Sequence, residues 1–158
     1  MIHADVSKTL ESLKKAHAEI VRRMENMVRG FAYEFAMTAV SNTPLGDDEK
    51  YFKLYQRRTY LQPIAGFAQG SWQYSESGTL PQQDIYSGSE ALAIIKSKLA
   101  GYKLGETVTI GNTGPYIVNL ENGYSNQAPD GIVKPTIDQV MNAYKINPVS
   151  YTHLRAHE

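Results

Sequence analysis

Two carboxylates, Glu121 and Asp130, are the residues whose type and spacing could support acid–base chemistry. Either could hold or release a proton, but the sequence around them supplies no recognisable nucleophile or base. The histidines His3 and His17 lie near the N-terminus, so a Ser–His–Asp triad would require that segment to fold over a distant serine. We therefore predict no catalytic residue, and a small hydrolase built on these carboxylates is the third of three function classes.

Glu121 follows Leu120 in a predicted turn. A carboxylate at such a place can accept hydrogen bonds from backbone N–H groups or meet a Lys or Arg side chain of a neighbour. We interpret Glu121 as a structural residue.

Metal and phosphate motifs are absent from the sequence. There is no cysteine, which excludes disulfide frameworks and cysteine-based zinc sites, and no H-E-x-x-H motif occurs. Residues 111–115 (GNTGP) are glycine-rich, but no lysine follows and the proline removes an N–H donor, so they do not match a phosphate loop. The sequence predicts neither a cofactor nor a metal site.

The last residues, 149–158 (VSYTHLRAHE), resemble one reading frame of a translated sequencing adapter. On this interpretation the natural sequence is known to about Pro148, and the alternative is a genuine polar tail. Segments introduced during cloning or sequencing are left out of fold reasoning. The H-x-x-x-H spacing of His153 and His157 therefore carries no metal-site argument.

Residues 1–148 fit one domain, large enough to bury about two thirds of its unfolded surface. Hydrophobic residues make up 42% of the chain, and the formal net charge is zero. Zero net charge argues against a dominant role in binding nucleic acid or a membrane surface. The longest apolar run, residues 91–95, is far shorter than the ~20 residues that a bilayer span requires.

Residues 6–41 carry the pattern of one long helix, with Gly30 as its one glycine and Ser7 as the predicted N-cap. Apolar or ring-bearing side chains recur in alternating steps of four and three, which is the a/d spacing of a helix seam. They are Val6, Leu10, Leu13, His17, Ile20, Met24, Met27 and Phe31. On this seam, His17 is interpreted as a packed or interface histidine rather than as a metal ligand.

The two halves of this helix differ in what surrounds the seam. The first half has strongly charged other faces, whereas residues 31–37 (FAYEFAM) are apolar on more than one side. A helix that becomes apolar around its circumference enters a core, so we expect residues 28–41 to pack on the domain. For residues 6–27 two alternatives stay open: they project or pack on a neighbouring subunit, or the whole helix lies on its own sheet.

Residues 42–63 are predicted to form a loop insertion, because Pro44 cannot continue the helix. The later part interleaves tyrosines with basic residues, a composition that can stack on nucleic acid, although residues 47–49 (DDE) offset the charge locally. The second function class is therefore a nucleic-acid contact module that uses five arginines. They are Arg22, Arg23, Arg29, Arg57 and Arg58.

Residues 64–148 are predicted to form an α+β core. Residues 69–74, with Trp72 in the core, and residues 106–110 fit strands. Ser87 and the three residues after it (SGSE) fit a capping box, which opens a helix that ends near Gly101. A last helix starts at about Pro135. The expected fold is a long N-terminal helix and two further helices packed on a small, mainly antiparallel sheet.

Residues 111–135 connect the second predicted strand with the last helix. Gly123 is expected to take a positive φ, which a residue with a Cβ would resist. Tyr116, Leu120 and Ile132 are expected to anchor the connection in the core. We interpret this segment as a connection that sets the shape of the domain.

Three separated segments resemble a family of tailed-bacteriophage neck and tail-completion proteins. The most specific is residues 110–131, which contain the family pattern N-x-x-P-Y-x-x-x-L-E-x-G-x-S-x-Q-A-P-x-G. Residues 43–46 (TPLG) are similar to a Thr-Pro turn that follows the N-terminal helix, and residues 66–72 are similar to a glycine–small–tryptophan strand. The insertion at residues 47–63 departs from members in which the turn runs directly towards that strand.

The resemblance implies a virion structural protein at the head–tail junction, with no catalytic residue to carry over. It implies a homo-oligomeric ring that contacts other phage connector and tail proteins, in the virion and, during assembly, in the bacterial cytoplasm. Ring subunits make heterologous contacts that close by rotation. This is the leading function class, and it requires neither a cofactor nor a membrane.

Overall fold

The structure is a computed structural model that describes residues 6–46, 66–81 and 87–145. Within these ranges the chain forms five helices and a two-stranded sheet, which confirms the predicted α+β class. The elements are α1 (Val6–Asn42), α3 (Phe67–Gly70), β1 (Trp72–Ser75), α4 (Gly88–Leu99), β2 (Thr109–Asn112), α5 (Ile117–Glu121) and α6 (Val133–Ala143). Most of the predicted loop insertion, including Arg57 and Arg58, and the suspected adapter tail lie outside the described residues.

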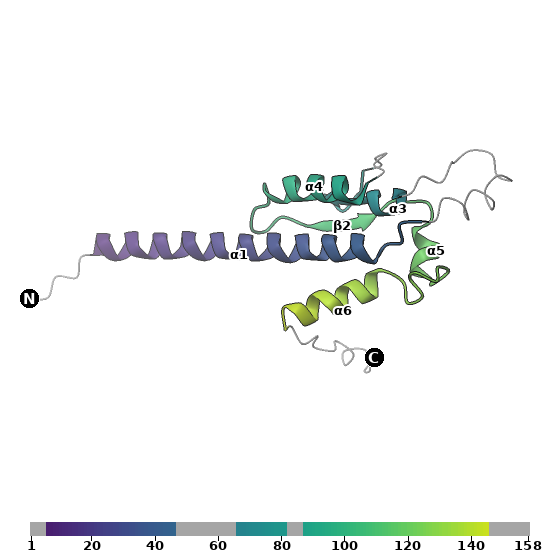
Figure 1. The fold of residues 1–158 in the computed structure, drawn as a ribbon. Coiled ribbons are helices and arrows are strands. Elements are labelled where there is room, and N and C mark those ends of the chain that lie inside the picture. The colour runs from purple at the N-terminus through teal and green to yellow at the C-terminus, as the bar shows by residue number, and fades with distance from the viewer. Residues whose placement is uncertain (1–5, 47–65, 82–86, 146–158) are drawn as a thin grey trace, which may run out of the picture.

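Helix α1 is the element on which the others pack. It is 37 residues long, which corresponds to about 55 Å at ~1.5 Å per residue, and it ends one residue beyond the predicted boundary. Ser7, the predicted N-cap, lies inside the helix. Figure 1 shows α4 and the sheet on one side of α1 and α6 on the other. The expectation that α6 packs on the sheet is thus refined, because α6 contacts α1 instead.

The core forms where the second half of α1 meets the sheet and α4. Ala32, Ala36 and Ala39 are buried there, as predicted for residues 28–41, and their small side chains allow neighbouring elements to approach closely. Trp72 is 2% exposed and, as predicted, belongs to the core. Its indole N–H donates a hydrogen bond to Thr43 Oγ1 over 2.8 Å, which satisfies the one polar atom of a buried ring.

Both predicted strands are displaced towards the C-terminus. Strand β1 starts at Trp72, because residues 67–70 form the short helix α3, and it pairs antiparallel with β2 from Trp72 opposite Asn112 to Ser75 opposite Thr109. The chain turns away after Ser75, whose Oγ accepts a hydrogen bond from the Ser77 N–H. The strand predicted at residues 106–110 therefore begins at Thr109. Its partner strand ends at Ser75, and the described part of the chain places no strand opposite residues 106–108.

Helix α4 begins and ends close to the predicted positions, but its start uses different contacts. Ser87 occupies the N-cap position as predicted, yet its side chain makes no capping hydrogen bond, so the predicted capping box is wrong. The Ser87 hydroxyl instead lies 2.7 Å from the Ser89 hydroxyl. At the other end Lys96 lies over the Tyr33 ring, 5.5 Å from its centroid, and this cation–π contact ties α4 to α1.

The connection from β2 to α6 contains the short helix α5, where a strand or turn was expected. Leu120 and Ile132 are buried and anchor the connection, as predicted. Gly123 has φ +76°, also as predicted, and a Cβ there would collide with the Pro129 carbonyl oxygen. Pro135 lies in the first turn of α6, where the absence of its N–H has no cost.

Candidate functional site

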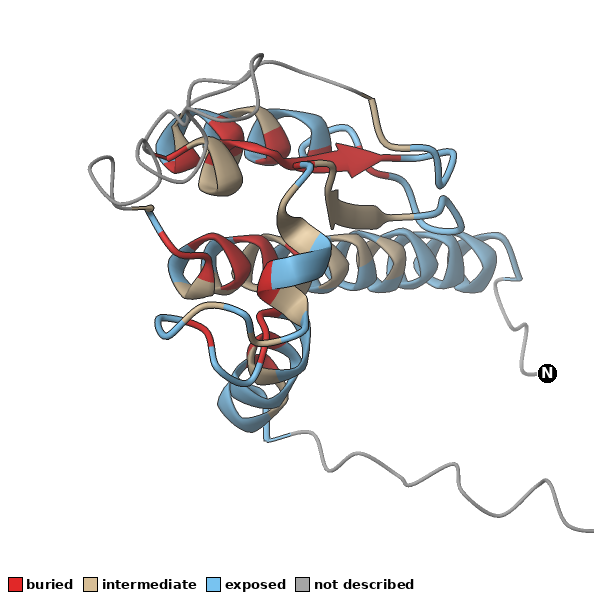
Figure 2. Ribbon diagram, turned by 90° about the vertical axis from the view of Figure 1, so that its right-hand side faces the viewer, coloured by how far each residue is buried: buried red, intermediate tan, exposed pale blue. Residues whose placement is uncertain are grey.

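A row of large apolar side chains on the first half of α1 is exposed, and we call it the seam. It consists of Val6, Leu10, Leu13, Ile20, Met24 and Met27, with His17 in the same row. Their exposed fractions range from 41% at Met24 to 73% at Val6. Figure 2 shows that α1 is exposed near its N-terminus and becomes buried where it meets the other helices and the sheet, which together with this part of α1 we call the body.

The described residues leave the seam uncovered because α6, the helix that packs on this face of α1, ends at Ala143. Phe31 is the next residue in the seam's spacing, and the ring of Tyr144, directly after α6, packs edge-on against it with centroids 5.4 Å apart. Farther along α1, Asn42 Nδ2 donates a hydrogen bond to Thr136 Oγ1 over 3.1 Å, near the start of α6. Helix α6 therefore lies antiparallel on the seam face between Phe31 and Asn42, and leaves the part before Phe31 open.

This geometry decides between the two alternatives for residues 6–27. Residues 6–18 are all exposed, and Figure 1 shows the N-terminal part of α1 extending past α4 and α6. Within the described part of the chain, the first half of α1 therefore projects from the body. The bare stretch from Val6 to Met27 is roughly 30 Å long at ~1.5 Å per residue.

The projecting half carries pairs of charged side chains on its own surface. Glu19 accepts hydrogen bonds from Arg22 at 2.9 Å and from Arg23 at 2.7 Å, and Lys15 pairs with Glu11 at 3.2 Å. Hydrogen bonds from Arg22 and then Arg23 lower the pKa of Glu19 to about 2. Pairs at these spacings each give a helix a small stabilisation.

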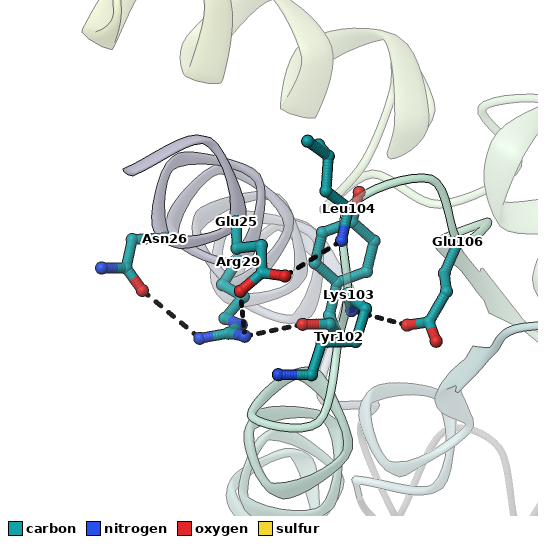
Figure 3. Close-up of polar contacts among 7 residues, drawn as sticks. All are labelled: Glu25, Asn26, Arg29, Tyr102, Lys103, Leu104 and Glu106. Carbon is teal, nitrogen blue, oxygen red and sulfur yellow. Dashed lines mark hydrogen bonds and ion pairs between the residues drawn. The ribbon is translucent and has the colours of Figure 1, made fainter. Parts of the chain in front are cut away.

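A polar cluster of Glu25 and Arg29 fixes the point at which α1 leaves the body (Figure 3). Arg29 Nη2 donates a hydrogen bond to the Tyr102 carbonyl oxygen over 2.6 Å, and Glu25 Oε1 accepts one from the Leu104 N–H over 3.2 Å. The two side chains also pair with each other at 3.3 Å. The Arg29 side chain is only 25% exposed and the Glu25 side chain only 12%. The loop they contact is shaped by the Lys103 N–H, which donates to Glu106 Oε2.

Sequence reasoning missed this cluster as a tertiary contact. The spacing of four between Glu25 and Arg29 could have indicated an ion pair within the helix. Nothing in the sequence connects that pair with the backbone of a loop 73 residues farther along the chain.

The arginines of the predicted nucleic-acid class are already bonded within the chain where the structure describes them. Arg22 and Arg23 share Glu19, and Arg29 is held by Glu25 and the Tyr102 carbonyl. Such pairs compete with phosphate for the guanidinium donors. All three described arginines of this class are therefore bonded within one subunit and give the nucleic-acid class no support.

The predicted carboxylate pair is not used as a pair. Glu121 Oε2 accepts hydrogen bonds from the backbone N–H groups of Ile132 at 2.9 Å and Val133 at 3.0 Å, at the N-terminus of α6. This confirms that Glu121 binds backbone N–H groups, where a carboxylate also meets the positive end of the helix dipole. Gly131, with φ +80°, lets the chain pass so closely that a Cβ there would lie 2.6 Å from the Glu121 carbonyl oxygen. Asp130 is exposed.

Two other kinds of site are absent from residues 6–46, 66–81 and 87–145. In these ranges no three His, Asp or Glu side chains gather closely enough to hold a metal ion. None of the helices described there combines the length and the apolar character that a membrane crossing needs. The exposed apolar seam is therefore the candidate functional site of the described residues.

Comparison with known proteins adds no relative. No protein-family model, no curated protein and no solved structure matches this chain.

Proposed function

We propose that this chain is a structural subunit that works by protein–protein assembly at the head–tail junction of a tailed bacteriophage. The observation that carries the assembly role is the seam, six large apolar side chains exposed on a helix that leaves the body. Contiguous exposed apolar surface flanked by polar residues typically marks an interaction site. On this proposal the seam is an assembly surface, and the chain performs no turnover.

The phage context of the proposal comes from the sequence pattern at residues 110–131. The structure gives a physical reason for several positions of that pattern: Leu120 is buried, Glu121 binds the start of α6, and Gly123 and Gly131 have positive φ. The conformation of the chain thus restricts which residue types fit at these four positions. A pattern with geometric demands at several positions supports kinship more strongly than a match among exposed loop residues would.

The proposed partners are further copies of the chain in a ring and the connector and tail proteins on either side of it. A ring requires two different surfaces on each subunit, because its contacts are heterologous. In each subunit the body supplies surface for such contacts, and the projecting half of α1 adds the seam as a separate assembly surface. Zero formal net charge suits association between proteins better than electrostatic attachment to DNA.

The proposal is tested by sedimentation velocity of the full chain, alone and mixed with the products of the genes beside its own. We expect stable complexes with portal-side or tail-side proteins, and capsid, portal and tail-tube genes among the neighbours. Replacing Leu13 and Ile20 with Glu should weaken assembly, because two charges would be placed in the buried apolar contact of the seam.

The matched control places the same two charges on the same half of α1 but off the seam, as Ser12→Glu and Ala18→Glu, both at exposed positions. The control should assemble like the unaltered chain. A chain that stays monomeric in the presence of all its neighbours would contradict the proposed function.

A further inference from the structure

The occupant of the seam can be derived from what already covers the rest of the same face. Helix α6 shows that this face accepts an antiparallel helix, from Asn42 back to Phe31. The open part lies directly beyond Tyr144 and continues for roughly 30 Å at ~1.5 Å per residue. An occupant must therefore be another helix of similar length with an apolar stripe of its own.

We propose that the seam binds the seam of a second copy, as an antiparallel pair of α1 helices. This inference rests on the proposed function, in which the seam is an assembly surface, and it names the partner. The first half of α1 in a second copy has the required length and the required a/d spacing. The two seams of such a pair are present at equal concentration because they belong to the same protein. A two-fold axis makes the contact isologous, so one surface serves both partners.

The position of α6 excludes a parallel pair. In a parallel pair the two bodies would lie side by side, and both α6 helices would point into the contact, because they lie on the seam face between Phe31 and Asn42. Paired helix axes are only ~8–10 Å apart, which leaves no room for two more helices. In an antiparallel pair the bodies lie at opposite ends, and each α6 lies beyond the partner's seam.

Antiparallel seams interleave so that each a position faces a d position of the partner, which allows a small number of registers one heptad apart. One register covers the whole row from Leu10 to Met27. Its layers, each formed twice, are Leu10 with Met27 of the partner subunit, Leu13 with Met24 of the partner subunit, and His17 with Ile20 of the partner subunit. The partner's Val6 then reaches the level of Phe31, so the partner's helix and α6 together fill the face end to end.

The residues beside the seam favour the same register. It places Lys14 next to Val21 of the partner subunit and Ala16 next to Arg23 of the partner subunit, so no like charges meet. The register shifted by one heptad would place Lys14 against Lys14 of the partner subunit and would leave Met27 uncovered. Like charges across a helix pair are destabilising, so the first register is the one we assign.

The expected dimer is of modest strength. Standard stable interfaces bury roughly 800 Å² per partner, and a single pair of helices roughly 30 Å long covers less than that. We therefore expect a dissociation constant on the order of micromolar. Before assembly we expect the free chain to be in equilibrium between monomer and dimer, and subunits join the ring from this pool.

The first experiment is sedimentation equilibrium of the full chain across the micromolar range. We expect a dimer for the unaltered chain and no measurable dimer for the Leu13→Glu, Ile20→Glu variant. The homodimer contains each substitution twice, so four charges at ~10-fold each should raise the dissociation constant ~10,000-fold. The Ser12→Glu, Ala18→Glu control should dimerise like the unaltered chain. Circular dichroism checks that both variants remain folded.

The second experiment fixes direction and register without depending on a destabilising change. The chain has no cysteine, so single cysteines report contacts cleanly. A mixture of Ala16→Cys and Arg23→Cys chains should form a disulfide-linked dimer under mild oxidation, whereas neither variant should do so efficiently alone. Efficient self-linking of the Ala16→Cys chain would show the shifted register and overturn the proposed pairing.

The remaining outcomes separate this inference from the proposed function. A chain that is monomeric at ~100 μM, well above the expected dissociation constant, overturns the pairing. If that monomer still joins its genomic neighbours, the proposed function stands. A cross-linked dimer that binds none of the neighbours keeps the pairing and contradicts the phage role. A monomer with slow amide exchange along the seam would show that the seam is covered within its own chain and would overturn the pairing.

Discussion

Residues 6–27 and residues 28–42 belong to one uninterrupted helix and share one apolar spacing, yet they have opposite surroundings. In the second half the buried positions are small, as at Ala32, Ala36 and Ala39, and other elements close over them. In the first half the seam carries large side chains with nothing described above them. Apolar periodicity thus predicts that a helix face will be covered, without showing what covers it.

The largest difference between the halves should appear when a small residue is enlarged. Ala36 is fully buried, and Ala18 lies eighteen residues earlier, about five turns, on the same side of the helix but exposed. Ala36→Leu should lower the free energy of unfolding by about 1–3 kcal/mol, because the core has no space for the added atoms. Ala18→Leu should change it by less than ~0.5 kcal/mol. Urea denaturation of both variants measures this, and equal losses would show that the first half is packed within its own subunit.

The next difference concerns the ion pairs of the two halves. Arg29→Met removes the donor to the Tyr102 carbonyl and leaves the poorly exposed Glu25 carboxylate without its cation. The free energy of unfolding should fall by about 1–3 kcal/mol. Lys15→Met removes the counterpart pair with Glu11, in which both side chains are more than two-thirds exposed, and should have almost no effect. A similar loss from both changes in urea denaturation would argue against an anchoring role for the Glu25–Arg29 cluster.

A smaller effect is expected at the helix that covers the second half. Glu121→Ala leaves the backbone N–H groups of Ile132 and Val133 without their acceptor, which should cost about 1 kcal/mol of the free energy of unfolding, as for other lost helix caps. Amide exchange in α6 should become faster, and the bare stretch of α1 should then extend past Phe31. Asp138→Ala, which removes an exposed pair with Lys134, is the matched control and should leave exchange unchanged.

The smallest effect concerns the charged side chains of the projecting half. Because the pKa of Glu19 is about 2 in the folded helix and 4.5 ordinarily, its pairing stabilises the helix above pH 4.5. This contribution is lost as the pH falls from 4.5 through 2, because the carboxylate must then be protonated. Far-ultraviolet circular dichroism should show a small loss of helix over that window, and the Glu19→Gln variant should show a flatter profile. A transition of the same size in both would assign the acid sensitivity to other carboxylates.

Local sequence signals predicted much of the fold. The bounds of α1 at Val6–Asn42, the buried Trp72, the positive φ of Gly123 and the start of α6 beside Pro135 all follow from properties of one residue or of one periodic run. The strand limits were wrong because a strand ends where its partner ends. The pairing of Ser75 with Thr109 depends on a turn that no local pattern of residues 106–110 contains.

For the candidate site, the seam and the structural use of Glu121 were predicted, since both depend on residue type and spacing. The residues that contact Glu121 were not predicted. A carboxylate shows that it needs donors without showing which ones, and the donors proved to be the N–H groups of Ile132 and Val133. The Glu25–Arg29 cluster shows the same limit, because its acceptor and donor are backbone atoms of a loop and carry no signal in the side chains.

The sequence by itself determined that this chain has a long amphipathic helix, one α+β domain and no recognisable catalytic or metal-binding motif, because helix period, chain length and residue chemistry are local quantities. Only the tertiary structure decided which part of the helix is covered. Cover depends on where α6 ends against Phe31 and where Glu25 and Arg29 meet the body, and these contacts join residues far apart in the chain. The open seam from Val6 to Met27 is what those contacts leave uncovered.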